Sequence, residues 1–135
     1  MTCPPLRMNP GLTVLLVEDD AVFLRIAAIA LRAMGCSVVA ASSPDEAISR
    51  FDEQPGVFDV LITDAIMPSM HGRELSELLT GRKSELKTLY MSGYDPDVLA
   101  ERGLVCENDA FLQKPFILAD LAGCLRTLLD VHARG

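Results

Sequence analysis

TVLLVEDD, residues 13–20, is a continuous apolar run that ends in acidic residues. An aliphatic run with no polar alternation is typical of a strand that is buried on both faces of a parallel sheet. Open parallel sheets place their functional sites at the carboxyl ends of such strands, which is where Glu18, Asp19 and Asp20 stand. The stretch therefore predicts both the kind of sheet and the edge at which to look for chemistry.

Strand-like and helix-like segments alternate along the rest of the chain. Strands are expected at Thr13–Val17, Cys36–Ala41, Val57–Thr63, Lys87–Met91 and Ala110–Gln113. Helices are expected at Ala21–Met34, after Ser43, at Gly72–Thr80, at Asp97–Arg102 and from about Ile117 to Val131. Such alternation with short connections predicts a doubly wound α/β fold, in which helices cover both faces of a parallel sheet.

Local signals support the helices. Ser43 is a good N-cap, Pro44 suits the first helical position, and Glu46 is placed for a capping box. Gly35 is the expected stop of the first helix. Apolar residues recur at helical spacing in two segments: Val22, Ile26, Ile29 or Ala30, and Ala33 in the first, and Leu118, Leu121, Leu125, Leu128 and Leu129 in the last.

Composition bounds the class of protein. With 135 residues, half of them hydrophobic, the chain is expected to form one globular domain. Its net charge of −7 argues against direct binding to nucleic acid or to an acidic membrane surface. Residues 1–11 are rich in proline and lack the apolar core of a secretory signal, so a flexible leader or linker is expected there, and residues 132–135 are expected to form a short tail.

The cysteines do not form a zinc or disulfide pattern. Cys3, Cys36, Cys106 and Cys124 show no CxxC spacing, and only two histidines accompany them. We expect free thiols, three of them packed as small hydrophobic side chains, in a reducing cytoplasm.

Polar residues follow four of the five expected strands. They are Glu18-Asp19-Asp20 after the first, Asp64 after the third, Ser92-Gly93 after the fourth and Lys114-Pro115 after the fifth. Each has an ordinary explanation: helix capping for the acids, a turn for Asp64, loop chemistry for Ser92 and solvent exposure for Lys114. No structural requirement puts carboxylates, a hydroxyl and an ammonium at the ends of four different strands.

Phosphoryl transfer onto a carboxylate does require this combination. Clustered carboxylates repel one another unless a hard cation such as Mg²⁺ lies among them. One carboxylate can then act as the nucleophile, while a lysine and a hydroxyl bind the phosphoryl oxygens. The pattern thus predicts an acyl-phosphate site at one edge of the sheet.

Four motifs in order give the sequence a family resemblance. They are VLLVEDD at 14–20, DAIMP at 64–68 with Met70 and Gly72, YMSGY at 90–94, and FLQKPF at 111–116. From about Leu12 to Val131 the chain resembles a response-regulator receiver domain, and it is similar to receivers attached to hybrid sensor histidine kinases. The resemblance implies a flavodoxin-like sheet of five strands in the order 2-1-3-4-5 with five helices.

The resemblance also implies roles for individual residues. Asp64 would be the phosphoacceptor and Lys114 the lysine that serves it. Mg²⁺ would be held by Glu18, Asp19, Asp64 and the backbone carbonyl of Ile66.

Two further residues would convert phosphorylation into a change of shape. Ser92 corresponds to the switch hydroxyl and Phe111 to the switch aromatic, and the Lys114–Pro115 bond would be cis. Phe111 has no hydroxyl, so we expect it to prefer a buried rotamer. Ile66 and Tyr94 lie two residues past Asp64 and Ser92, and we expect their bulk to slow hydrolysis of the acyl phosphate.

The implied partners are a histidine kinase or a His-containing phosphotransfer protein as donor, or a small donor such as acetyl phosphate. A downstream protein would bind the face formed by the fourth helix, fifth strand and fifth helix. The domain would be a cytoplasmic switch rather than a metabolic enzyme, either alone or as a module of a hybrid histidine kinase.

Two alternatives from other classes remain open. A degenerate receiver would act as an interaction module without phosphorylation, which requires the loss of a catalytic group, and here none is lost. A phosphatase with an aspartyl nucleophile would place a second Asp at the position of Ile66. A P-loop enzyme is excluded more firmly, because no GxxxxGK[ST] motif occurs.

Overall fold

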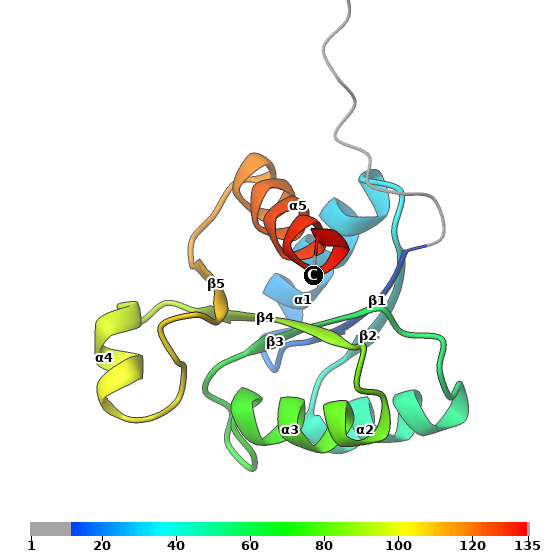
Figure 1. Ribbon diagram of the computed structural model, residues 1–135, viewed down its shortest axis with the longest axis horizontal. Helices are drawn as coiled ribbons and strands as arrows, with labels where there is room; N and C mark the ends of the chain where they lie inside the picture. The colour runs from blue at the N-terminus through cyan, green and yellow to red at the C-terminus, as the bar shows by residue number, and fades with distance from the viewer. Residues whose placement is uncertain (1–11, 135) are drawn as a thin grey trace, which may run out of the picture.

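A parallel sheet with helices on both faces makes up the fold in a computed structural model that describes residues 12–134 (Figure 1). The expected leader, residues 1–11, and Cys3 lie outside the described residues, as does the last residue of the expected tail. The strands are β1 (Thr13–Val17), β2 (Ser37–Ala41), β3 (Val60–Asp64), β4 (Lys87–Ser92) and β5 (Ala110–Gln113). The helices are α1 (Ala21–Ala33), α2 (Pro44–Glu53), α3 (Gly72–Arg82), α4 (Pro96–Glu101) and α5 (Leu118–Arg134).

The strand order is β2-β1-β3-β4-β5, and every pairing is parallel. Helices α1 and α5 cover one face of the sheet, whereas α2 and α3 cover the other (Figure 1). The expected fold class and strand order are therefore confirmed. The order reverses direction between β1 and β3, and parallel sheets of this kind bind their ligands beside such a reversal.

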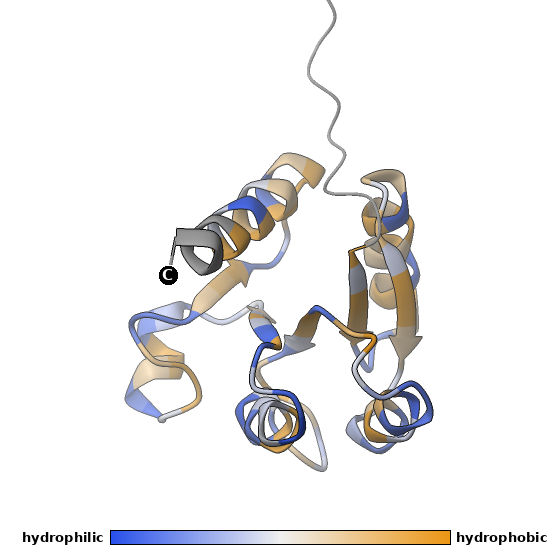
Figure 2. Ribbon diagram, turned by 45° about the vertical axis from the view of Figure 1, so that its right-hand side comes forward, coloured by the Kyte–Doolittle hydropathy of each residue, from blue (hydrophilic) through white to orange (hydrophobic). Residues whose placement is uncertain are grey.

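Alternation along the strands divides the core into two layers. Val14 and Leu16 of β1 point toward α1 and α5, and Leu15 and Val17 point toward α2 and α3. The strands are accordingly rich in hydrophobic residues, which Figure 2 colours orange. Burial on both faces explains why TVLLV has no polar alternation.

Strand β3 begins at Val60, so the expected start at Val57 was wrong. Gly56 has φ +77° and the Val57 N–H donates to the Gln54 carbonyl, which makes the preceding residues a turn. Val57 is 45% exposed. Its hydrophobic side chain imitates a strand residue in sequence, although the backbone there is not paired with the sheet.

Helix α1 packs on a face other than the one that carries Val22, Ile26 and Ile29. Val22, Ile26 and Ile29 are 69%, 58% and 60% exposed. The buried residues of the helix are instead Ala27, Ala28 and Leu31. Small side chains let a helix approach the sheet closely. The helix itself was predicted correctly, but the apolar spacing identified residues that face solvent.

Helix boundaries follow the predicted caps in most places. Ser43 caps α2, accepting from the Glu46 N–H at 3.1 Å, but the Glu46 carboxylate bonds the N–H of Ser42 and not that of Ser43. Helix α5 continues to Arg134, past the expected end at Val131, and its leucine stripe packs into the core. Within residues 12–134, no helix is both long and apolar enough to cross a membrane.

The described cysteines are free, as expected. Cys36 is buried, Cys124 is half-buried and Cys106 is exposed, so residues 12–134 account for two of the three cysteines that were expected to pack as small hydrophobic side chains.

Candidate functional site: an acidic pocket at the sheet edge

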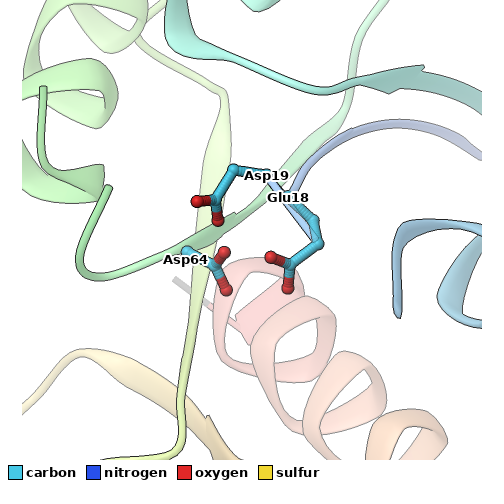
Figure 3. A group of neighbouring side chains, drawn as sticks. All are labelled: Glu18, Asp19 and Asp64. Carbon is cyan, nitrogen blue, oxygen red and sulfur yellow. The ribbon is translucent and has the colours of Figure 1, made fainter. Parts of the chain in front are cut away.

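Three carboxylates meet at the carboxyl ends of β1 and β3. Oxygen atoms of Glu18, Asp19 and Asp64 all lie within 4.8 Å of one another (Figure 3). Glu18 and Asp64 are only 1% and 4% exposed, whereas Asp19 is exposed to solvent. The structure thus brings together the three acids that were predicted to hold a metal.

Strand register explains why the first two acids meet. In the β1–β3 pairing Val17 lies beside Thr63, so the next residues, Glu18 and Asp64, emerge together at the same edge. The first turn of α3 also lies against this edge. A Cβ on Gly72 would come within 2.2 Å of the Asp64 carbonyl oxygen, so only glycine fits there.

The third acid of the EDD run has a different role. The Asp20 carboxylate caps α1, accepting from the N–H groups of Val22 and Phe23 at 3.0 and 3.1 Å. The ordinary explanation, helix capping, therefore holds for Asp20. The Asp20 N–H in turn donates to Glu18 Oε2 at 3.0 Å, which helps to fix the Glu18 carboxylate.

Lys114 reaches the acids from the end of β5. Its ammonium donates to Asp64 Oδ1 at 2.7 Å and also bonds Glu18 Oε1. The Lys114 N–H donates to the Ser92 carbonyl at 2.8 Å, and the Lys114–Pro115 bond is cis, as expected. Lys114 thus forms ion pairs with two side chains that lie about 50 and 96 positions away along the chain.

The pocket is electrostatically strained without a cation. Burial, and then the neighbouring Glu18 carboxylate, raise the pKa of Asp64 to about 8 even though Lys114 opposes the shift. Burial would raise the pKa of Glu18 as well, but hydrogen bonds with Asp64 and Lys114 hold that pKa below its usual value. These shifts disfavour ionisation of both carboxylates beside one ammonium, and a divalent cation held among them would supply further positive charge.

Burial would lower the pKa of the Lys114 ammonium. Hydrogen bonds to the carboxylates of Asp64 and Glu18 outweigh burial and raise that pKa above its usual range. The lysine therefore stays charged, as a group that binds phosphoryl oxygens must be.

The pocket around these groups has a volume of about 260 Å³. Its lining residues come from four strand ends, and they are Glu18, Asp19, Asp20, Asp64, Ile66, Met91, Ser92, Gly93, Tyr94 and Lys114. Ile66 and Tyr94, the two residues whose bulk is expected to slow hydrolysis, are among these lining residues.

The two residues expected to form the switch occupy neighbouring strands. Ser92 is 6% exposed, and its Oγ accepts from the Tyr94 N–H at 3.1 Å inside the pocket. Phe111 is outside the pocket and half-buried, packed against the cluster that contains Tyr90 and Leu99. The structure therefore joins Ser92 to the acids and places Phe111 one strand away, beside Tyr90 in the sheet register.

The model of the response regulator receiver domain family matches residues 14–126. The chain is 34% identical over 123 residues to the sensor kinase CckA of Brucella abortus, covering 91% of this chain and 13% of that protein. It is 32% identical over 116 residues to the receiver protein CpdR of the same organism, covering 86% of this chain and 95% of that protein.

Solved structures agree with this likeness. The receiver domain of the hybrid histidine kinase CckA superposes with a TM-score of 0.72 at 31% identity, covering 87% of this chain and 98% of that chain. A response regulator receiver protein from Sinorhizobium medicae gives a TM-score of 0.76 at 26% identity, covering 88% and 94%. From its sequence motifs, its sheet order and these matches, the chain belongs to the response regulator receiver domain family.

Proposed function

We propose that Asp64 accepts a phosphoryl group from a phosphohistidine on a histidine kinase or a His-containing phosphotransfer protein. The observation that carries this proposal is the convergence of Asp64, Glu18 and Lys114 in one pocket, with a single ammonium bonded to both carboxylates. A buried carboxylate beside a charged lysine is suited to nucleophilic attack on phosphorus.

The acidic pocket fits Mg²⁺. Glu18, Asp19 and Asp64 offer carboxylate oxygens within 4.8 Å of one another, and the Ile66 backbone lies on the same pocket. A set of hard oxygen donors with room for water is what Mg²⁺ prefers. When bound there, Mg²⁺ would neutralise charge on the incoming phosphoryl oxygens and reduce their repulsion by the acids.

The chain's own groups carry the transfer. An oxygen of the Asp64 carboxyl group attacks phosphorus and forms a P–O bond, while the proton of that carboxyl group passes through water to the imidazole ring of the donor. The P–N bond of the donor breaks, and its electron pair returns to the imidazole ring of the histidine. Lys114 holds one phosphoryl oxygen, and the Ser92 hydroxyl turns to donate to another.

We further propose that this movement of Ser92 alters the face formed by α4, β5 and α5. Ser92 ends β4. Phe111 lies on the adjacent strand and packs against the hydrophobic cluster that contains Tyr90 and Leu99 of α4. When Ser92 moves toward the phosphoryl group, it leaves space toward which the Phe111 ring can rotate. A downstream protein would read the resulting surface.

An exposed apolar strip supports a protein as the donor. Val22, Ile26 and Ile29 on α1 and Ile117 after β5 are each more than half exposed. Exposed patches of this kind mark protein interaction sites, and Val22 and Ile117 follow two lining residues of the acidic pocket, Asp20 and Lys114, by two and three positions. A donor docked on it would present its phosphohistidine to Asp64. We place this encounter in the cytoplasm.

The test is intact mass after incubation with Mg²⁺ and acetyl phosphate. We expect a gain of about 80 Da, the mass of one phosphoryl group, that is lost in EDTA and in Asp64→Asn. An identical gain in Asp64→Asn would contradict the assignment of Asp64. If neither acetyl phosphate nor a phosphorylated kinase modifies the chain, the alternative of a degenerate receiver, acting as an interaction module without phosphorylation, is favoured.

A further inference from the structure

The ammonium of Lys114 rests on an aromatic ring. Lys114 Nζ lies 4.3 Å from the ring centroid of Phe23, on the first turn of α1. Its other two contacts are the carboxylates of Asp64 and Glu18. Phe23 contacts the ammonium but is not among the residues that line the acidic pocket.

The ring itself is held from two directions. The Phe23 N–H donates to the capping carboxylate of Asp20 at 3.1 Å, which fixes the backbone at the start of α1. The Phe116 ring meets Phe23 edge to face, with centroids 5.3 Å apart and an interplanar angle of 89°. Phe116 lies two residues after Lys114, so the loop that carries the lysine also clamps the ring beneath it.

A lysine needs such support more than an arginine does. Its charge is a compact point at the end of a flexible four-carbon chain, and many rotamers are open to it. A ring face attracts the cation but carries no net charge, so it does not neutralise the ammonium as a third carboxylate would. Two N–H groups are engaged by Asp64 and Glu18, which leaves a third to bind a phosphoryl oxygen.

We propose that Phe23 is a positioning residue for phosphoryl transfer: its ring holds the Lys114 ammonium against Asp64 and Glu18. This role rests on the proposed function of Asp64 as phosphoacceptor. Phe23 acts through Lys114 and does not touch the phosphoryl group.

The test compares Phe23→Leu with Phe23→Tyr, using acetyl phosphate as donor so that no docking on α1 is involved. We expect Phe23→Leu to lower the maximal rate of phosphorylation about 3- to 10-fold, while Phe23→Tyr, which keeps a ring face, stays within about 2-fold of the wild type. Ala33→Ser, at the exposed C-terminal end of α1, is the control and should leave the rate unchanged. Thermal melting of each variant measures any loss of fold separately.

A double-mutant cycle tests whether the effect passes through the lysine. In a Lys114→Ala background, Phe23→Leu should cause no further loss of rate. The proposal is overturned if Phe23→Leu phosphorylates at the wild-type rate, if Phe23→Tyr is as slow as Phe23→Leu, or if the loss persists without the lysine.

An NMR measurement separates this proposal from the proposed function. The ring current of Phe23 should shift the ε-methylene protons of Lys114 upfield, and Phe23→Leu should abolish that shift. If the wild-type chain takes up no phosphoryl group, the function of Asp64 is wrong, and the NMR shift still decides whether the ring holds the ammonium. Absence of the upfield shift in the wild type overturns the placement itself.

Discussion

Two regions of the sheet meet at the functional pocket, and they differ in how deeply their side chains are buried. At the ends of β1 and β3, Glu18 and Asp64 are buried, and Lys114 joins them. At the β4–β5 edge, α4 is six residues long and has Leu99 as its buried residue, and Phe111 is only half-buried. The first region is held by burial and ion pairs, whereas fewer buried side chains hold the second, as the proposed function requires.

The β5 edge is also hollow on its other side. A groove of about 780 Å³ lies between β5 and α5, with Phe111 and Cys124 among its lining residues. Interiors that are packed at full density resist change, whereas loosely filled regions permit side-chain rearrangement at low cost. The comparison teaches that one domain can combine a buried, ion-paired cluster of polar residues with an edge where side chains are less fully packed.

The largest expected loss of stability comes from a substitution beside the ends of β1 and β3. Gly72→Ala should destabilise the fold by about 3 kcal/mol, because its Cβ would lie 2.2 Å from the Asp64 carbonyl oxygen. Gly81→Ala on the same helix is the control, since no atom lies within 4 Å of a Cβ there. Urea unfolding measures both, and equal stability of the two variants would show that α3 can shift away from β3.

A cavity under α4 should lower the free energy of unfolding through the second region, at the β4–β5 side of the sheet. Leu99→Ala removes a fully buried side chain and should cost about 2 kcal/mol of unfolding free energy. Because Leu99 lies outside the pocket, the rate of phosphorylation by acetyl phosphate should stay within about 2-fold of the wild type. A large loss of that rate would mean that the two regions are not separable.

The charge strain in the pocket should appear as a pH dependence of stability. The pKa of Asp64 is raised from 3.8 to about 8 in the folded, metal-free chain, so the folded state binds a proton that the unfolded state releases. Stability in EDTA should therefore fall as pH rises from about 4 to about 8. The lowered pKa of Glu18 acts in the opposite sense, but only in the acid range below 4.5.

Removing the Asp64 charge tests that strain. Asp64→Asn should reduce the fall of stability with rising pH. It should also raise the free energy of unfolding in EDTA at pH 8 by roughly 1 to 2 kcal/mol. Chemical unfolding at several pH values measures it, and a wild-type stability that rises between pH 5 and pH 8 would contradict it. Added Mg²⁺ should stabilise the wild type more than the variant.

The smallest effect concerns the rim of the pocket. Ile66→Asn should shorten the half-life of the phosphorylated form about 3-fold, because a smaller polar side chain admits and orients the attacking water. The loss of the 80 Da adduct, about one phosphoryl group, measures this half-life. A half-life unchanged by the substitution would remove any role for the bulk of Ile66.

Much of the fold was predictable because its signals are local. The aliphatic run before Glu18 required a strand buried on both faces, and Ser43 with Pro44 required a helix start. Failures came where one residue type serves two environments. Val57 has the side chain of a strand residue but lies in a turn after Gly56. Helix α1 buries Ala27, Ala28 and Leu31, while Val22, Ile26 and Ile29 face solvent.

The candidate site was predictable to a similar degree. The position of each polar group after a strand brought Glu18, Asp64, Ser92 and Lys114 to one edge, because the carboxyl ends of parallel strands coincide. Nothing local distinguishes Asp19 from Asp20, yet one faces the pocket as a candidate ligand and the other caps α1. The direction in which the chain enters α1 decides which of the two side chains faces the pocket and which one caps the helix.

The sequence by itself determined the class of sheet, the order of its elements and which residue types stand at the strand ends, since these depend on periodicity and on neighbours along the chain. Only the tertiary structure decided the face on which α1 packs, the contact of Gly72 with the Asp64 backbone, and the seat of Lys114 on the Phe23 ring. Those features join segments far apart in sequence, so the physical reason lies in packing and shared charge, which no local pattern records.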